Sequence, residues 1–150
     1  MVDVLLDIDD QSWCDFSLIG IVAQEPDYRM AWLLNTQLNM NFIRKADLRP
    51  AGNIETAAID RPGYSVFYCR LPFQEPQFRL IGNKTLPQPC IKESDGFDFI
   101  LQISDAPSTF VEEWVKSLRK LPAIQWCGTL KNISDKSMSL LIFEDHEDTT

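Results

Sequence analysis

Short alternating apolar segments, with only two helical patterns among them, predict an α+β fold built on a mainly antiparallel sheet. About eight segments of the 150-residue chain have the apolar runs or the period-two alternation of strands. Apolar residues recur at helical spacing in only two stretches. A doubly wound parallel sheet is disfavoured because it needs a helix after nearly every strand. The length and the 45% apolar content predict one domain over residues 1–150.

The first half of the chain is expected to hold five strands and one helix. Residues 2–8 alternate between apolar and mostly acidic side chains, which predicts a half-buried strand, and the apolar run over 15–23 predicts a central strand. A helix is expected after Pro26, ending at Asn39 or Asn41. The remaining segments are strands over 42–48, 64–71 and 78–84, the last two as a hairpin, and a loop rich in Pro and Gly over 50–63.

The second half is expected to repeat the strand–helix–strand order. The clearest alternation covers 97–104, and the clearest amphipathic pattern follows it. Thr109 and Glu112 fit a capping box at the start of that helix, and Pro122 ends it. Strands are expected over 124–130 and 140–143, before an acidic tail at 144–150 that is expected to be disordered.

The two halves resemble each other, which favours a particular arrangement of the sheet. Asp15-Phe16 and Asp98-Phe99 both open a strand, and their offset of 83 residues aligns Leu18 with Leu101. Each strand is followed by a proline-bearing link, a helix and another strand. This order predicts two split β-α-β units, the ferredoxin-like plan, with extra strands.

Composition disfavours several functional classes. The net charge of −8 argues against a general attraction to nucleic acid or anionic membranes. His146 in the tail is the only histidine, and the four cysteines form no C-x-x-C pair, so neither a Ser-His-Asp site, nor a metal site, nor a bound cofactor is expected. The cysteines are read as reduced thiols. Without a signal peptide or a membrane span in the sequence, we expect a cytoplasmic protein.

The charge is unevenly distributed along the chain. Residues 1–28 carry −7, residues 29–84 carry +4 and residues 85–150 carry −5. The middle segment is also rich in aromatic residues, and basic strands with interleaved aromatics can bind single-stranded RNA. The favoured interpretation is that these aromatics lie in the core and that the basic strands pair with acidic ones, so a nucleic-acid partner is not expected.

Two groups of polar residues are candidates for a small-molecule or ion site. Ser104 and Asp105 end a strand directly before the helix start at Ser108 and Thr109, where free N–H groups can hold a phosphate or carboxylate. The capping box competes for the same N–H groups. Asp7, Asp9 and Asp10 could hold Mg²⁺, but no Gly-rich phosphate loop accompanies them, so no metal site is predicted.

The segment Ile91-Lys92-Glu93-Ser94-Asp95-Gly96-Phe97-Asp98-Phe99 resembles the motif of the IPExxxVDY family of small bacterial proteins. Ile91, Glu93 and Asp98 match outright, Phe97 and Phe99 replace Val and Tyr, and Lys92 replaces the family's proline. The resemblance implies a bacterial, cytoplasmic protein without an assigned activity. From the residues alone, Glu93 and Asp98 are interpreted as fixing the turn before the strand.

Three functions remain open at this point. The leading one is a non-enzymatic protein-interaction or accessory domain that binds itself or another protein, through open sheet edges or exposed tryptophans. The second is a small-ligand-binding regulatory domain that resembles ACT domains. The third is an enzyme that uses carboxylates among Asp95, Asp98 and Asp105, which requires two of them to converge in a pocket.

Overall fold

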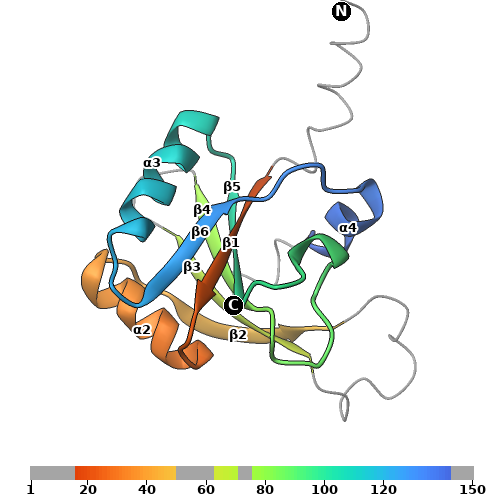
Figure 1. The fold of residues 1–150 in the computed structure, drawn as a ribbon, viewed down its shortest axis with the longest axis horizontal. Coiled ribbons are helices and arrows are strands. Elements are labelled where there is room, and N and C mark those ends of the chain that lie inside the picture. Colours follow the sequence, from red (N-terminus) through yellow and green to blue (C-terminus); the bar gives the residue numbers. More distant parts are fainter. Residues whose placement is uncertain (1–15, 50–62, 71–75, 143–150) are drawn as a thin grey trace, which may run out of the picture.

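The computed structural model describes residues 16–49, 63–70 and 76–142 and has an α+β fold, as predicted. Within these residues, six strands and three α-helices are present, together with a 3₁₀ turn at Lys92–Ser94. The strands are β1 (Phe16–Ala23), β2 (Ile43–Leu48), β3 (Tyr64–Arg70), β4 (Gln77–Gly82), β5 (Phe99–Ser104) and β6 (Ile124–Thr129). The helices are α2 (Asp27–Gln37), α3 (Ser108–Arg119) and α4 (Asp135–Leu140) (Figure 1).

The strands form one antiparallel sheet in the order β2-β3-β4-β5-β1-β6. β3 and β4 pair as the predicted hairpin, with Phe67 opposite Leu80. β1 lies between β5 and β6, and α3 connects those two strands across it. The outer strands of the sheet are therefore β2 and β6.

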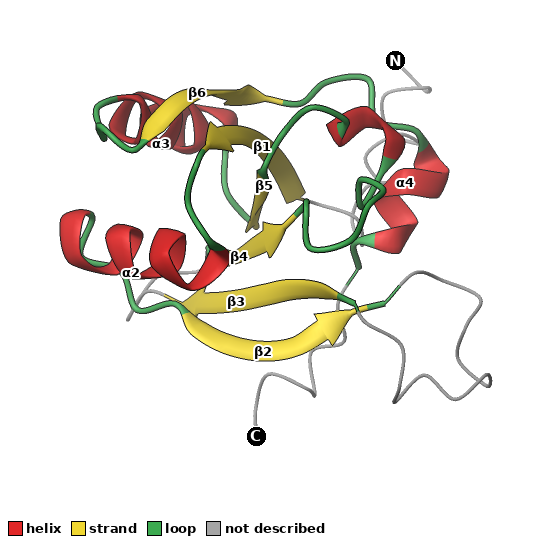
Figure 2. Ribbon diagram, turned by 60° about the horizontal axis from the view of Figure 1, so that its bottom comes forward, coloured by secondary structure: helices red, strands yellow, loops and turns green. Residues whose placement is uncertain are grey.

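Both faces of the sheet are covered, by α2 and α3 on one side and by α4 on the other (Figure 2), and apolar side chains pack on each face. α2 and α3 lie on one face, where their buried residues pack against side chains such as Ile19, Phe78 and Leu101. On the other face a smaller cluster contains Leu18 and Ile100 and is closed by Leu141 after α4. Because adjacent residues of a strand point to opposite faces, the sheet contributes to both clusters.

The predicted helices are present, but the capping box is wrong. α2 ends at Gln37, and Asn39 has a positive φ of 60°, as expected for a residue that terminates a helix. α3 begins at Ser108 with Pro107 at the N-cap and no side-chain cap, so Thr109 lies inside the first turn. Proline has no side-chain acceptor, and Thr109 comes too late in the chain to fill the N-cap position.

The structure also corrects the end of the chain and the proposed internal repeat. The strand predicted over 140–143 is wrong for the described residues 140–142, because Leu140 ends α4. The offset of 83 aligns Leu18 with Leu101, yet these two lie in opposite core clusters. A shift of one residue exchanges the faces of a strand, so this offset does not relate equivalent positions.

Several sequence predictions lie outside the described residues. They concern the strand at 2–8, the acidic group Asp7, Asp9 and Asp10, and the tail with His146. Most of the loop predicted over 50–63 also lies outside.

Candidate functional site

The segment that resembles the family motif wraps around one buried side chain, Asn83, which directly follows β4. The Asn83 Nδ2 donates to the carbonyls of Ser94 (2.9 Å) and Phe97 (2.8 Å). Its Oδ1 accepts from the Cys90 N–H (2.7 Å) and the Ser94 hydroxyl (3.1 Å). The side chain amide thus uses its full hydrogen-bonding capacity while only 2% of the residue is exposed. Sequence reasoning missed Asn83, because an Asn after a strand is typical of any turn.

Glu93 holds the start of α4 rather than a ligand. Its carboxylate accepts from the Ser137 hydroxyl (2.7 Å) and from the Ser134 N–H (3.0 Å). These bonds, from Ser137 first and Ser134 second, lower the pKa of the Glu93 carboxyl from 4.5 to about 2. A carboxylate at a helix N-terminus is also favoured by the helix dipole. This supports the interpretation of Glu93 as a structural residue.

Glu93→Gln is expected to remove an acid-sensitive part of the stability. A carboxyl with a lowered folded pKa stabilises the fold above pH 4.5, and this contribution is lost as the pH falls toward 2. We expect Glu93→Gln to unfold more easily at pH 7, by about 1 kcal/mol in this partly exposed site, and to differ little from wild type at pH 2. Urea unfolding between pH 2 and pH 7 measures the free energy of unfolding of both proteins. The control is Glu113→Gln, at an exposed ion pair with Lys116, which should leave the free energy of unfolding unchanged at either pH. A difference between Glu93→Gln and wild type that stays constant at all pH values would contradict the structural role of the Glu93 carboxylate.

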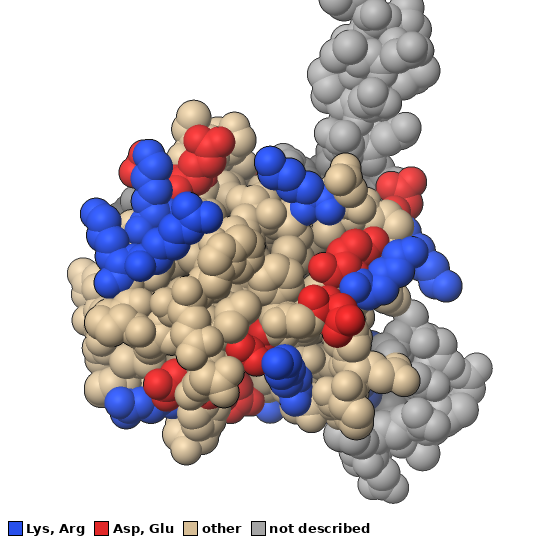
Figure 3. Space-filling model, in the orientation of Figure 1, with Lys and Arg blue, Asp and Glu red and all other residues tan. Residues whose placement is uncertain are grey.

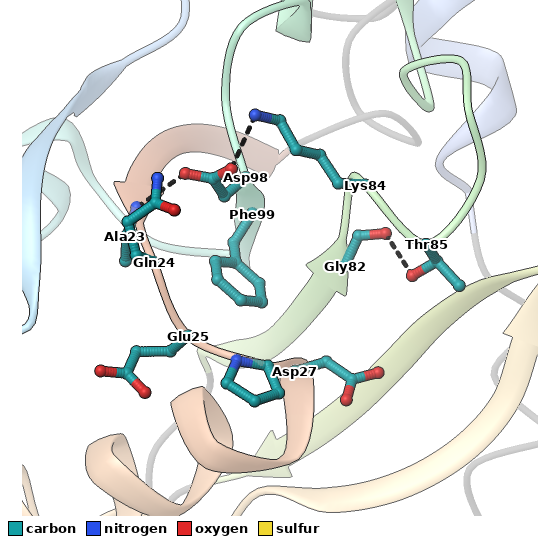
Figure 4. A pocket seen from close by; sticks show the side chains of 10 residues that line it. Ala23, Gln24, Glu25, Asp27, Gly82, Lys84, Thr85, Asp98 and Phe99 are labelled. Carbon is teal, nitrogen blue, oxygen red and sulfur yellow. Dashed lines mark hydrogen bonds and ion pairs between the residues drawn. The ribbon is translucent and has the colours of Figure 1, made fainter.

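Asp98 joins the ends of three strands and borders a pocket (Figure 4). Its Oδ2 accepts from the Ala23 N–H at the end of β1, and its Oδ1 lies 2.8 Å from the Lys84 ammonium. The pocket has a volume of about 460 Å³ and lies between the loop before α2 and the turn after β4. Its polar side chains are Gln24, Glu25, Asp27, Lys84, Thr85 and Asp98, and the ring of Phe99 also lines it.

The three carboxylates of the enzyme hypothesis, Asp95, Asp98 and Asp105, do not meet in one pocket. Asp98 is paired with Lys84, whereas Asp95 is exposed and does not line the pocket. Asp105 follows the opposite end of β5, about 20 Å away for a six-residue strand. The carboxylates therefore do not converge, and the residues that the structure describes contain no group of three His, Cys, Asp or Glu that can hold a metal.

The four residues of the predicted anion site do not form one pocket. Ser104 ends β5, Asp105 is exposed with a positive φ of 58°, and Thr109 lies on the exposed side of α3. Only Ser108 borders a hollow, the groove between α3 and β6.

The described cysteines are free thiols with little nucleophilic character. Burial raises the pKa of Cys90 to about 12 and also raises the pKa values of Cys69 and Cys127. A thiol with a raised pKa is protonated at neutral pH and is a weak nucleophile. Cys14 lies outside the described residues.

The aromatic side chains on or directly beside the strands of the basic middle segment are unavailable for stacking on bases. Those that the structure describes are buried: Phe42, Tyr64, Phe67, Tyr68 and Phe78. Recognition of single-stranded RNA by stacking requires exposed rings, and these strands present no such ring among the residues that the structure describes. The interpretation of these aromatics as core residues is confirmed.

The exposed aromatic side chains lie elsewhere, on α2 and on β6. Tyr28 is 69% exposed and Trp32 is 52% exposed, one turn apart on the outer side of α2. Trp126 on β6 is 50% exposed. By contrast, the outer side of α3 carries charged residues, namely Glu112, Glu113, Lys116 and Arg119 (Figure 3). Two helices that cover the same face of the sheet thus differ in what they present to solvent.

The comparisons with known proteins add no relative: no protein-family model matches the chain, and neither does any curated protein or solved structure. No helix within residues 16–49, 63–70 and 76–142 is long and apolar enough to cross a membrane.

Proposed function

We propose that this protein is a non-enzymatic interaction domain that binds another protein or a second copy of itself through the outer side of α2. The observation that carries the proposal is the pair of exposed aromatics, Tyr28 and Trp32. Large aromatic side chains contribute most of the binding energy in many protein interfaces. Lone exposed apolar residues are common, but two large rings on one helical turn form a patch.

The inner and outer sides of α2 support this proposal. Met30, Ala31, Leu33 and Leu34 are buried against the sheet. A helix with one covered face normally presents charged residues to water, as α3 does. The outer side of α2 instead combines Tyr28 and Trp32 with Arg29, whose guanidinium lies 5.0 Å from the Trp32 ring centroid. Tyr, Trp and Arg are the residue types enriched in interface centres.

The test compares Trp32→Ser with Trp126→Ser, because the two tryptophans are almost equally exposed. Light scattering measures self-association, and affinity capture from source-cell extract in high salt measures binding to another protein. We expect whichever association the wild type shows to weaken at least tenfold in Trp32→Ser and to persist in Trp126→Ser. A wild-type chain that is monomeric and captures no protein would overturn the proposal, and so would equal effects of the two variants.

A second candidate function, small-ligand binding, is favoured by the pocket beside Asp98. The pocket holds Lys84 as its cation and three carboxylates, on Glu25, Asp27 and Asp98. This mixture of charges suits a small zwitterionic molecule, such as an amino acid. Thermal-shift screening with amino acids tests it, with Lys84→Met as the variant that should lose the shift.

The plan of the sheet is compatible with either function. We propose a ferredoxin-like plan for β4, β5, β1 and β6, with β2 and β3 as additional strands at the β4 edge. Its support is that α2 and α3 pack on the same face and that α3 crosses from β5 to β6 over β1. Membership of the IPExxxVDY family and a cytoplasmic location are likewise proposals, supported by the motif at 91–99 and by the sequence composition.

A further inference from the structure

β6 forms one open edge of the sheet, and a groove of about 580 Å³ runs along it. One wall of the groove belongs to α3, with Val111, Val115, Lys116 and Arg119, and the other includes Trp126. Lys131 lies at the end where β6 leaves the sheet. Figure 3 shows basic and acidic side chains over α3, beside an uncharged area over β6 and β1. The charged residues that line the groove are Glu112, Lys116, Arg119 and Lys131, so the groove carries a net positive charge and also has an apolar side.

The apolar side is a rigid aromatic surface. The Trp126 ring stacks on Phe97 with a centroid distance of 5.5 Å and an interplanar angle of 29°. Beneath them, Gly128 and Gly20 are direct partners in the sheet, and a Cβ at either would come within 2.8 Å of a ring. The glycines let both rings lie close against the backbone, which holds the half-exposed indole in place.

Backbone groups of β6 also point into the open edge. Leu130 donates its N–H to Leu18 of β1, and N–H directions alternate along a strand. The N–H groups of Cys127 and Thr129 therefore point away from β1. The Cys127 carbonyl also points outward and accepts from Arg119 Nε at 3.1 Å. Arg119 also lines the groove, and its guanidinium has two further nitrogens that can bind a carboxylate.

The charge of the described residues differs in sign from that of the whole chain. They contain 13 Lys and Arg against 10 Asp and Glu, a net charge of +3, whereas the full chain carries −8. The acidic excess lies in the remaining segments. Residues 1–15 contribute −5 without a single basic residue, and residues 143–150 contribute −4. The groove is thus complementary in charge to both ends of its own chain.

We propose that residues 2–9 of this chain occupy the groove as a seventh strand paired with β6. In this segment Val2, Val4, Leu6 and Ile8 alternate with a mostly acidic set, Asp3, Leu5, Asp7 and Asp9. In a strand, the first set lies on one face and the second on the other. Beside β6, the apolar face lies next to Trp126, and the acidic face lies next to Lys116, Arg119 and Lys131. The C-terminal segment has the charge but lacks this alternation.

The connection to β1 is long enough for this position. Residues 10–15 link the segment to Phe16, and six residues span about 20 Å when extended. Crossing β6 requires two strand spacings, about 10 Å. Ser17 itself lines the groove, so the chain enters β1 beside the proposed site. This inference is independent of the interaction proposed for α2.

The first test breaks the pairing in the full chain with Val4→Pro/Leu6→Pro, since proline cannot donate to a strand neighbour. Amide hydrogen exchange of Cys127 and Thr129 reports on the β6 edge. We expect both amides to exchange at least tenfold faster in this variant than in wild type. The matched control, Glu144→Pro/Glu147→Pro in the other acidic segment, should leave them unchanged. Equal exchange in wild type and Val4→Pro/Leu6→Pro would overturn the proposal.

The second test offers two peptides to the Val4→Pro/Leu6→Pro chain, whose own segment cannot pair. Peptides 1–10 and 143–150 each carry four acidic side chains and no Lys or Arg. We expect peptide 1–10 to restore the protection of the Cys127 and Thr129 amides from exchange. It should bind at least tenfold more tightly than peptide 143–150, and its affinity should fall in high salt. Equal affinities would mean that charge alone recruits acidic chains, and would overturn the assignment of residues 2–9.

Discussion

Asn83→Leu is expected to lower the free energy of unfolding by about 4 kcal/mol, because it removes every hydrogen bond of a buried amide while keeping its approximate size. Asn83 is 2% exposed and binds the backbone of Cys90, Ser94 and Phe97. After the substitution, one N–H and two carbonyls lose these partners inside the protein. A buried polar group without a partner costs about 1–3 kcal/mol. Urea unfolding at pH 7 measures the change.

The control for this prediction is Asn35→Leu, which replaces the same residue type in a partly buried site. Asn35 makes two hydrogen bonds, both with the backbone of Phe42. The groups that it leaves can reach water, so we expect a loss of about 1–2 kcal/mol. If Asn83→Leu and Asn35→Leu lower the free energy of unfolding equally, the hydrogen bonds of Asn83 do not hold the 90–98 segment in place. Asn83→Asp should also be strongly destabilising, because a carboxylate accepts but cannot donate to the carbonyls of Ser94 and Phe97.

The role of Asn83 shows which parts of the candidate site were predictable from the sequence. Alternation and helical spacing depend on neighbours along the chain, so the six described strands and the first two helices followed from them. The partners of Glu93 lie more than 40 positions away, at Ser134 and Ser137. The sequence interpretation was that Glu93 and Asp98 fix the turn before β5, whereas their carboxylates bind the start of α4, and Ala23 and Lys84, respectively. Their partners could not be predicted, because long-range pairing leaves no local pattern.

The errors at the helix ends have a similar physical origin. Thr109 and Glu112 have the right spacing for a capping box, but a neighbouring proline, Pro107, occupies the N-cap position instead. The strand predicted over 140–143 shares only Leu140 with α4, and its four consecutive apolar residues are too few to distinguish a strand from a helix. The start of α4 is bound by Glu93, 41 positions before Ser134, and the sequence around 135–140 does not reveal this contact.

The two edges of the sheet share a feature that limits association through them. Arg119 donates to the Cys127 carbonyl of β6, and Arg44 donates to the Lys45 carbonyl of β2. Charged side chains on edge strands disfavour pairing with arbitrary chains. At β6, an incoming strand must offer these cations a carboxylate, which an acidic alternating segment does. The exposed aromatics of α2, rather than a sheet edge, are therefore the favoured surface for binding an unrelated protein.

Phe78→Ala is expected to cause a loss comparable to that of Asn83→Leu, about 3–5 kcal/mol, the usual range for removing a buried aromatic ring. Phe78 of β4 is completely buried, and its ring contacts Phe42, Phe110 and Trp114 at centroid distances of 6.4, 6.3 and 5.1 Å. The Phe78 ring thus packs between α3 and Phe42, which directly precedes β2. The cavity would lie beneath both helices, where neither can move inward without losing its own contacts.

Two substitutions distinguish this cavity from a general loss of apolar surface. Phe78→Leu keeps most of the volume and should cost less than half as much as Phe78→Ala. Phe110→Ala removes an equal ring from a partly exposed position of α3, where water can fill the space, and should also cost less. Denaturant unfolding gives all three values. Equal losses for Phe78→Ala and Phe110→Ala would contradict the central role of Phe78, because only the Phe78 ring is completely buried and packs on Phe42, Phe110 and Trp114 together.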